Sequence, residues 1–290
     1  MGMLAELANE FPSVAEKFSE ASDILGFDLW QMVQNGPAED LSATQNTQPV
    51  LLTASAAVWD VWQSRYPLPD YVAGHSLGEY SALTCAGSIA FADAVRLVRL
   101  RGELMEAAVP RGQGAMAAVM GLEDAQVETC CAAVDGVVVA ANYNAPGQVV
   151  IAGAAAAVAA AADACKAAGA KRAVMLDVSG PFHSPLMAAA KAEFGAALAR
   201  VDIQMPQVPV VQNVTADVAA DVEQLRENLL AQLAEPVLWS KCVTRMVALG
   251  VDRFVECGPG NVLGGLARRI SKDTPTTSLA TPSSLESLSA

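Results

Sequence analysis

The chain has 290 residues, of which 53% are hydrophobic and 17% charged, and its formal net charge at pH 7 is −13. This length is enough for one large domain or two smaller ones with a sizeable buried core. The negative charge argues against nucleic-acid binding, which needs a basic surface. No apolar run reaches the roughly 18 residues of a membrane span, and we find no secretory signal, so we expect a cytoplasmic protein.

Cysteine and histidine usage limits the metal and redox chemistry that is open to the chain. The six cysteines show no Cys-x-x-Cys spacing, and the only two histidines are His75 and His183. A zinc site or a disulfide framework is therefore not predicted. We expect reduced, buried thiols in a reducing compartment.

The first part of the chain is predicted to be mainly helical, and a change of pattern follows near residue 115. Hydrophobic spacing predicts helices over residues 3–18, 21–33, 48–65 and 91–108, with a strand ending at residue 73. From residue 115 the predicted order becomes β-α-β-β-α-β, over residues 115–122, 123–134, 137–144, 148–153, 154–168 and 171–179. This order is typical of a ferredoxin-like unit. We therefore expect residues 113–180 to form a small inserted domain.

The remaining segments again alternate between strands and helices. The pattern predicts a helix over 184–200, a strand over 208–213, helices over 221–234 and 237–249, a strand over 253–257 and a helix ending near 269. Such alternation predicts an α/β fold with a parallel sheet covered on both faces, here over residues 1–112 and 181–270. Residues 271–290 are rich in Ser, Thr and Pro, and we expect them to form a flexible tail.

A Gly-x-Ser-x-Gly motif lies between the strand that ends at residue 73 and the helix that follows it. Its residues are Gly74, His75, Ser76, Leu77 and Gly78. In this context the pattern is typical of a nucleophile elbow, a tight turn that exposes the serine hydroxyl. We expect side chains at Gly74 or Gly78 to collide with the neighbouring element. The N–H of Leu77, at the start of the helix, would face a developing oxyanion. The alternative is a chance match in a loop rich in small residues.

A serine nucleophile needs a base, and the chain offers two histidines. His75 is adjacent to Ser76 on the tight turn, and we expect its ring to point away from the hydroxyl. His183 follows a predicted strand and precedes a helix, where open α/β sheets place their sites, so it is the candidate base. The alternative is a structural histidine. Since no acidic residue stands out as its partner, we expect a Ser-His dyad with a backbone carbonyl at Nδ1.

Arg101 is predicted to be buried. Winding residues 91–108 at about 100° per residue places Arg101 among Leu97, Leu104 and Met105 rather than on the polar face. A buried guanidinium is costly unless a carboxylate or a phosphate binds it. The partner is either an internal Asp or Glu, or a carboxylate that the substrate brings.

These segments together resemble the malonyl-CoA:acyl carrier protein transacylases of fatty acid synthesis and the related acyltransferase domains of polyketide synthases. The resemblance extends from residue 2 to about residue 269. It rests on six segments that occur in the same order: 74–80 (GHSLGEY), 101–102 (RG), 114–116 (GAM), 144–148 (NAPGQ), 180–184 (GPFHS) and 256–260 (ECGPG). The order of all six makes the resemblance specific, which the elbow alone would not.

The resemblance implies an α/β-hydrolase-like large domain with the ferredoxin-like insert. It also implies that Ser76 carries the malonyl group as an ester, that His183 acts as general base and then general acid, and that Arg101 binds the free malonyl carboxylate. In this family the backbone carbonyl of the residue matching Gln232 orients the histidine. Leu77 and Phe182 look like the variants that favour malonyl over branched groups.

The resemblance further implies ping-pong transfer from malonyl-CoA to the phosphopantetheine thiol of acyl carrier protein. The protein is then expected to need no cofactor of its own and to act as a monomer. The basic pairs Lys171-Arg172 and Arg268-Arg269 are candidate docking positions for the acidic carrier, although ordinary surface charge explains each pair equally well.

The printed sequence differs from the family pattern at its start. The family opens with a strand and a loop containing Gly-Gln-Gly-Ser-Gln, whose glutamine N–H is the second oxyanion donor, and Met1 comes just after that position. We expect a start codon assigned too late, and poor activity and stability for the printed chain. The alternatives to the transferase are a serine thioesterase or esterase and a truncated protein that only binds carrier protein.

Overall fold

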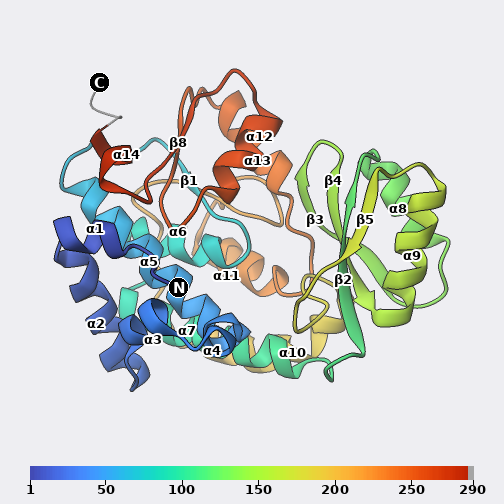
Figure 1. Cartoon of the computed structure of the whole chain (residues 1–290), viewed down its shortest axis with the longest axis horizontal. Coiled ribbons are helices and arrows are strands. Elements are labelled where there is room, and N and C mark those ends of the chain that lie inside the picture. Colours follow the sequence, from blue (N-terminus) through green and yellow to red (C-terminus); the bar gives the residue numbers. More distant parts are fainter. Residues whose placement is uncertain (287–290) are drawn as a thin grey trace. The chain divides into compact units, whose positions relative to one another are not determined.

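The computed structural model describes residues 1–286 of the chain. Residue contacts group the chain into two compact units. The first unit comprises Met1–Gly102, Val201–Val211 and Met246–Ala290, and the second comprises Glu103–Arg200 and Gln212–Arg245. The secondary structure elements of both units are labelled in Figure 1.

The first unit begins with five helices: α1 (Ala5–Glu10), α2 (Ser13–Leu25), α3 (Leu29–Asn35), α4 (Ala38–Ser42) and α5 (Thr44–Gln63). The sequence pattern predicted two helices where α1, α2 and α3 lie. Pro12 precedes α2 with a φ of −55°, and Gly26 ends α2 in the left-handed region with a φ of 77°. Proline at a helix start and glycine just after its end are favoured by backbone geometry, so they divide the predicted helices into three.

Two pairs of short parallel strands give the first unit its α/β character. β1 (Val72–Ala73) pairs with β6 (Val210–Val211), and β7 (Phe254–Glu256) pairs with β8 (Thr276–Ser278). β1 is followed by α6 (Leu77–Cys85), and β7 is followed by α13 (Val262–Ile270). Each pair thus contains a strand that turns directly into a helix, which is the connection expected in an α/β fold.

The segment after residue 270 is ordered as far as the structure describes it, unlike the flexible tail that we expected over 271–290. It contains β8 and α14 (Pro282–Glu286). Leu279 and Leu285 are completely buried, and the Tyr66 hydroxyl donates a hydrogen bond of 2.7 Å to the Leu285 carbonyl. Two buried leucines and the pairing with β7 therefore anchor a segment of polar composition. Residues 287–290 lie outside the described residues.

The second unit contains a four-stranded antiparallel sheet in the order β3-β4-β2-β5. The strands and their two helices follow the predicted β-α-β-β-α-β order: β2 (Gly114–Met120), α8 (Asp124–Ala132), β3 (Val138–Ala145), β4 (Gln148–Ala154), α9 (Ala155–Ala167) and β5 (Arg172–Met175). In Figure 1 both helices lie on one side of this sheet. Order and pairing are those of a ferredoxin-like unit.

The buried face of this sheet explains its stability. Val119 and Ile151 from the strands pack with Val127 from α8 and with Val158 and Cys165 from α9. This cluster is the apolar core that an antiparallel sheet with one helix-covered face requires. The last strand ends at Met175, earlier than predicted.

Further helices complete the second unit: η1 (Pro185–Met187), α10 (Ala188–Leu198), α11 (Val222–Ala231) and most of α12 (Trp239–Ala248). α7 (Phe91–Ala107) contributes residues to both units. The predicted insert of 113–180 covers the elements of the antiparallel sheet, whereas the contact-based second unit is larger. The predicted domain boundaries therefore stay a prediction.

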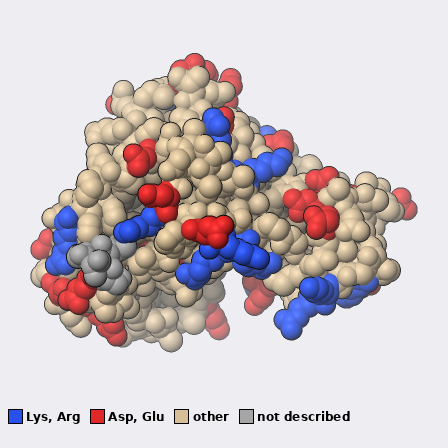
Figure 2. Space-filling model, turned by 90° about the horizontal axis from the view of Figure 1, so that it is seen from above, with Lys and Arg blue, Asp and Glu red and all other residues tan. Residues whose placement is uncertain are grey.

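Charged residues are spread over the surface. Figure 2 shows acidic and basic side chains on the same face, mostly in small groups among uncharged residues. The basic pairs Lys171-Arg172, at the start of β5, and Arg268-Arg269, near the end of α13, are all exposed. All six cysteines are free thiols, and four of them are buried. None of the helices in the described part of the chain combines the length and the hydropathy needed to cross a membrane.

The ordered segment after residue 270 can be tested by truncating one of its anchors. Leu279→Ala should lower the free energy of unfolding by about 2–5 kcal/mol, because it removes a fully buried side chain. Ser283→Ala is the control, since Ser283 lies in the same segment and is exposed. Urea unfolding followed by circular dichroism measures both, and equal midpoints for the two variants would show that the segment contributes nothing.

Candidate active site

The turn between β1 and α6 has the backbone geometry of a nucleophile elbow. β1 ends at Ala73, α6 begins at Leu77, and Ser76 between them has φ 53° and ψ −109°. A positive φ is unfavourable for a residue with a Cβ atom and occurs mostly where the surrounding structure enforces it, often at functional sites. This conformation is the one that the Gly-x-Ser-x-Gly motif predicts for a serine exposed at a sharp turn.

The two glycines of the motif differ in what they permit. A Cβ atom on Gly74 would lie 1.9 Å from the carbonyl oxygen of Gly78, so no other residue fits there without moving the backbone. A Cβ atom on Gly78 would meet nothing within 4 Å. The expected collision therefore exists at Gly74 and not at Gly78. The reason is that Gly78 already lies on α6, whose side chains point outward, whereas Gly74 faces the first turn of that helix.

The start of α6 provides a backbone donor beside the nucleophile. Leu77 is the first residue of the nine-residue helix, and the first N–H groups of a helix have no acceptor within it. The N–H of Glu79 donates 3.1 Å to the carbonyl of Ser76, and the N–H of Gly78 donates 2.9 Å to that of His75. The positive end of the helix dipole therefore lies at the serine, as an oxyanion-binding site requires.

Arg101 lies next to the serine hydroxyl in the first unit. Its side chain is buried, with 1% exposed, as the helical winding predicted. Its Nη2 donates to Ser76 Oγ at 3.2 Å, and its Nη1 donates to Gln48 Oε1 at 2.8 Å. The guanidinium carbon is 5.2 Å from the centre of the Tyr80 ring. A cation is thus held beside the nucleophile.

The electrostatics of this cluster follow from its burial. Burial lowers the pKa of Arg101 from its ordinary value, while Tyr80 and, to a smaller extent, the buried Glu79 act in the opposite direction. An arginine nevertheless remains protonated in proteins. Glu79 is an acidic neighbour of the kind that the sequence left open as a partner for Arg101. Both hydrogen-bond acceptors described for Arg101, Gln48 and Ser76, are neutral.

His183 is held in one orientation within the second unit. Its side chain is 3% exposed, its φ is 58°, and its Nδ1 lies 2.8 Å from the backbone oxygen of Gln232. A carbonyl oxygen can only accept, so Nδ1 carries the proton and, in the neutral ring, Nε2 carries the lone pair. The imidazole is therefore in the tautomer of a base, and a backbone carbonyl occupies the position that a carboxylate takes in a triad.

Phe182, directly before the candidate base, packs against one face of the antiparallel sheet. It contacts a small buried cluster formed by Met116, Ala141, Val150 and Ala152. The preceding Pro181 lies against Gly114, where a Cβ atom would be 2.3 Å from the proline ring. The segment that carries His183 is therefore fixed by packing on the insert.

The predicted site residues thus form two groups, one in each unit. In the first unit the structure brings together Ser76, Leu77 and Arg101. In the second unit it brings together His183 and Gln232, with Phe182 beside the histidine.

Comparison with known proteins agrees with this geometry. A protein-family model described as "Acyl transferase domain" matches residues 1–280. The chain belongs to the acyl transferase family. It is 51% identical over 288 residues to the malonyl CoA-acyl carrier protein transacylase of Salmonella typhimurium, covering 98% of this chain and 93% of that protein. It is 43% identical over 289 residues to the protein of the same name from Bacillus subtilis, covering 99% and 91%.

Solved structures of acyl transferases share the fold. An acyl carrier protein S-malonyltransferase from Vibrio cholerae matches with a TM-score of 0.96 and 50% identity, over 99% of this chain and 95% of that one. A malonyl-transacylase solved in complex with its type II PKS acyl-carrier protein matches with a TM-score of 0.97 and 48% identity, over 99% and 94%. The α/β fold with its parallel strands and ferredoxin-like unit is therefore the fold of this family.

Sequence reasoning missed two residues that contact Arg101 in this acyl transferase. Gln48 is 53 positions away along the chain, and nothing local marks it as a neighbour. Tyr80 could have been found, because positions four apart lie on the same face of a helix and Tyr80 follows Ser76 by four.

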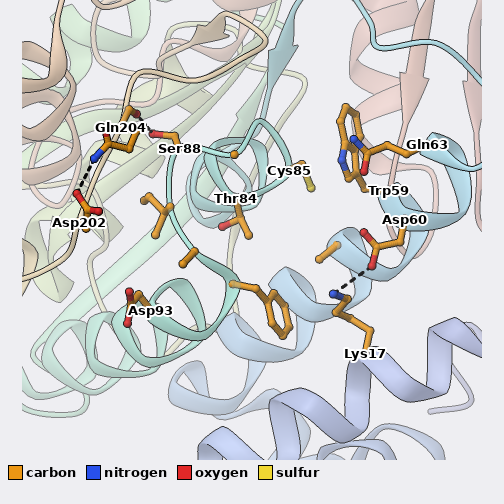
Figure 3. Close-up of a pocket in the computed structure, with 15 residues that line it drawn as sticks. Lys17, Trp59, Asp60, Gln63, Thr84, Cys85, Ser88, Asp93, Asp202 and Gln204 are labelled. Carbon is orange, nitrogen blue, oxygen red and sulfur yellow. Dashed lines mark hydrogen bonds and ion pairs between the residues drawn. The ribbon is translucent and has the colours of Figure 1, made fainter.

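A separate cavity of about 470 Å³ lies in the first unit and is shown in Figure 3. It is lined by Thr84 and Cys85, at the opposite end of α6 from Ser76. Figure 3 also shows Lys17 directed toward Asp60, with which it forms an ion pair of 3.1 Å. Neither the serine nor Arg101 lines this cavity, so it is not the candidate active site.

The different surroundings of the two motif glycines give a paired test. Gly74→Ala should lower the free energy of unfolding by at least about 2 kcal/mol and remove acylation of Ser76, because the added methyl group overlaps backbone atoms. Gly78→Ala should leave stability within about 1 kcal/mol, since the position is helical and open. Thermal unfolding and mass spectrometry of the acyl-enzyme measure both effects. Equal tolerance at the two positions would contradict the described turn.

Proposed function

We propose that this acyl transferase moves a malonyl group from malonyl-CoA to the phosphopantetheine thiol of an acyl carrier protein, through an ester on Ser76. The observation that carries the proposal is the buried guanidinium of Arg101, whose Nη2 lies 3.2 Å from the Ser76 hydroxyl oxygen. A malonyl group on that oxygen has a free carboxylate close to a cation, whereas an acetyl group has none. The names of relatives up to 51% identical support the same activity.

In the first half-reaction, His183 Nε2 takes the hydroxyl proton of Ser76 while the serine oxygen attacks the thioester carbon of malonyl-CoA. The Leu77 N–H stabilises the oxyanion, and the bond from carbon to sulfur breaks as His183 returns the proton to the CoA thiolate. In the second half-reaction the carrier thiol gives its proton to His183 and attacks the ester carbon. The bond to Ser76 then breaks, and the serine oxygen recovers the proton.

Binding of the substrate is assigned to residues of both groups. Arg101 binds the malonyl carboxylate, ideally through two parallel hydrogen bonds. Leu77 and Phe182 narrow the acyl pocket against a methyl branch, and the Gln232 carbonyl keeps His183 in the tautomer of a base. These assignments rest on the contacts within each unit and on the family resemblance.

The partners and the surroundings of the reaction follow from its chemistry. The reacting sulfur comes with each substrate, as a thioester in malonyl-CoA and as a thiol on the carrier, so we propose that the protein needs no cofactor of its own and acts as a monomer. We propose Lys171-Arg172 and Arg268-Arg269 as docking positions for the carrier, because all four side chains are exposed. Six free thiols fit a protein of the reducing cytoplasm.

The test of the function is the fate of the acyl group on Ser76. Incubation with malonyl-CoA should add the mass of one malonyl group to the wild-type protein and none to Ser76→Ala, as measured by intact-protein mass spectrometry. Carrier protein bearing phosphopantetheine should then remove the group much faster than buffer. Equally fast loss in buffer would indicate a hydrolase, and carrier binding without any adduct would indicate a protein that only binds.

The role of Arg101 predicts a change of substrate preference. Arg101→Ala should lower the ratio of kcat/KM for malonyl-CoA to that for acetyl-CoA by about 10- to 100-fold, since it removes a charge-assisted contact with the malonyl carboxylate only. Arg96→Ala is the matched control, because Arg96 is exposed on the same helix. If neither acyl group loads Ser76 in the Arg101 variant, the assigned role is wrong.

A further inference from the structure

Tyr80 lies beside the buried guanidinium of Arg101. It lies on α6, four residues after Ser76, and none of its surface is exposed. Its ring centre is 5.2 Å from the guanidinium carbon of Arg101, within the range of a cation–π contact. Since both side chains are buried, solvent does not screen this contact, and it is worth more than one at the surface.

The ring is neutral under the conditions in which the enzyme works. Burial raises the pKa of the Tyr80 phenol well above its usual value of 10.0, and the nearby Arg101 reduces this shift without cancelling it. The phenol therefore keeps its proton at neutral pH. A neutral aromatic face attracts a cation through its quadrupole and adds no negative charge.

This neutrality matters for a cation that has to bind a substrate carboxylate. A carboxylate at the same place would form an ion pair with Arg101 and compete with the incoming malonyl group. Gln48, which accepts from Nη1 at 2.8 Å, is neutral as well. The two side chains hold the guanidinium in place through neutral groups.

Building on the proposed function, we infer that Tyr80 is a positioning residue for malonyl selection. Its ring fixes the guanidinium of Arg101 beside the Ser76 oxygen, so that the preference for malonyl over acetyl depends on an aromatic side chain at position 80. The phenol also interacts with Arg101 as a hydrogen-bonding group, so the face of the ring and the phenol oxygen both contribute to this role.

The experiment measures kcat and KM for malonyl-CoA and for acetyl-CoA on the same preparation of each variant. The ratio of the two kcat/KM values does not depend on the fraction of folded enzyme, so it separates selection from stability. Tyr80→Leu should lower the ratio about tenfold, mainly through a higher KM for malonyl-CoA. Tyr80→Phe keeps the ring but removes the hydroxyl, and its ratio should fall between those of the wild type and Tyr80→Leu.

Two controls make the result specific. Tyr66→Leu removes a tyrosine of the same unit that stacks on Trp62 and bonds the Leu285 carbonyl, and it should leave the ratio unchanged. Tyr80→Met replaces Tyr80→Leu if the latter does not fold, because methionine adapts to irregular core space without an aromatic face. In an Arg101→Ala background, Tyr80→Leu should cause no further change in the ratio, since its effect passes through Arg101.

An unchanged ratio in the folded non-aromatic variant would overturn the inference. So would an equal loss in Tyr80→Phe, or a further fall in the Arg101→Ala background. These results differ from failure of the proposed function itself, which would appear as absence of malonyl on Ser76 in the wild-type protein.

Discussion

A buried positive charge beside a strained serine is the constraint on which the site in the first unit depends. Arg101 is withdrawn from water, which is costly for a guanidinium unless polar groups replace the lost hydration. The amide of Gln48, the hydroxyl of Ser76 and the ring of Tyr80 provide part of that replacement. The same burial that makes the charge costly also strengthens its attraction for a carboxylate that enters the site.

Much of this arrangement could be predicted from local sequence patterns. The elbow follows from two glycines around Ser76 between a strand and a helix, and the positive φ of the serine agrees with it. The burial of Arg101 follows from helical winding, because its neighbours on that face are apolar. The ferredoxin-like unit follows from the spacing of hydrophobic residues along 115–175, which changes from that of a strand to that of a helix in the order of the observed elements.

Features that depend on contacts between distant segments could not be predicted in this way. Gln48 reaches Arg101 from another helix, and its own surroundings in the sequence give no sign of that contact. The segment after residue 270 has the composition of a tail, yet Leu279 and the pairing of β8 with β7 keep it ordered. At Gly78 the sequence motif led us to predict a steric collision that does not exist. A Cβ atom there would meet nothing within 4 Å, because the residue lies on a helix and its side chain would point outward.

The hydrogen bond from His183 to a main-chain oxygen has a consequence for the charge around the imidazole. A carboxylate in that place would be a second titrating group coupled to the imidazole, and the two would lose protons in shared steps. The backbone carbonyl oxygen of Gln232 carries no net charge and does not titrate, so it orients the ring without placing a negative charge at Nδ1. Replacing the side chain of residue 232 would leave this contact in place, because the acceptor belongs to the main chain.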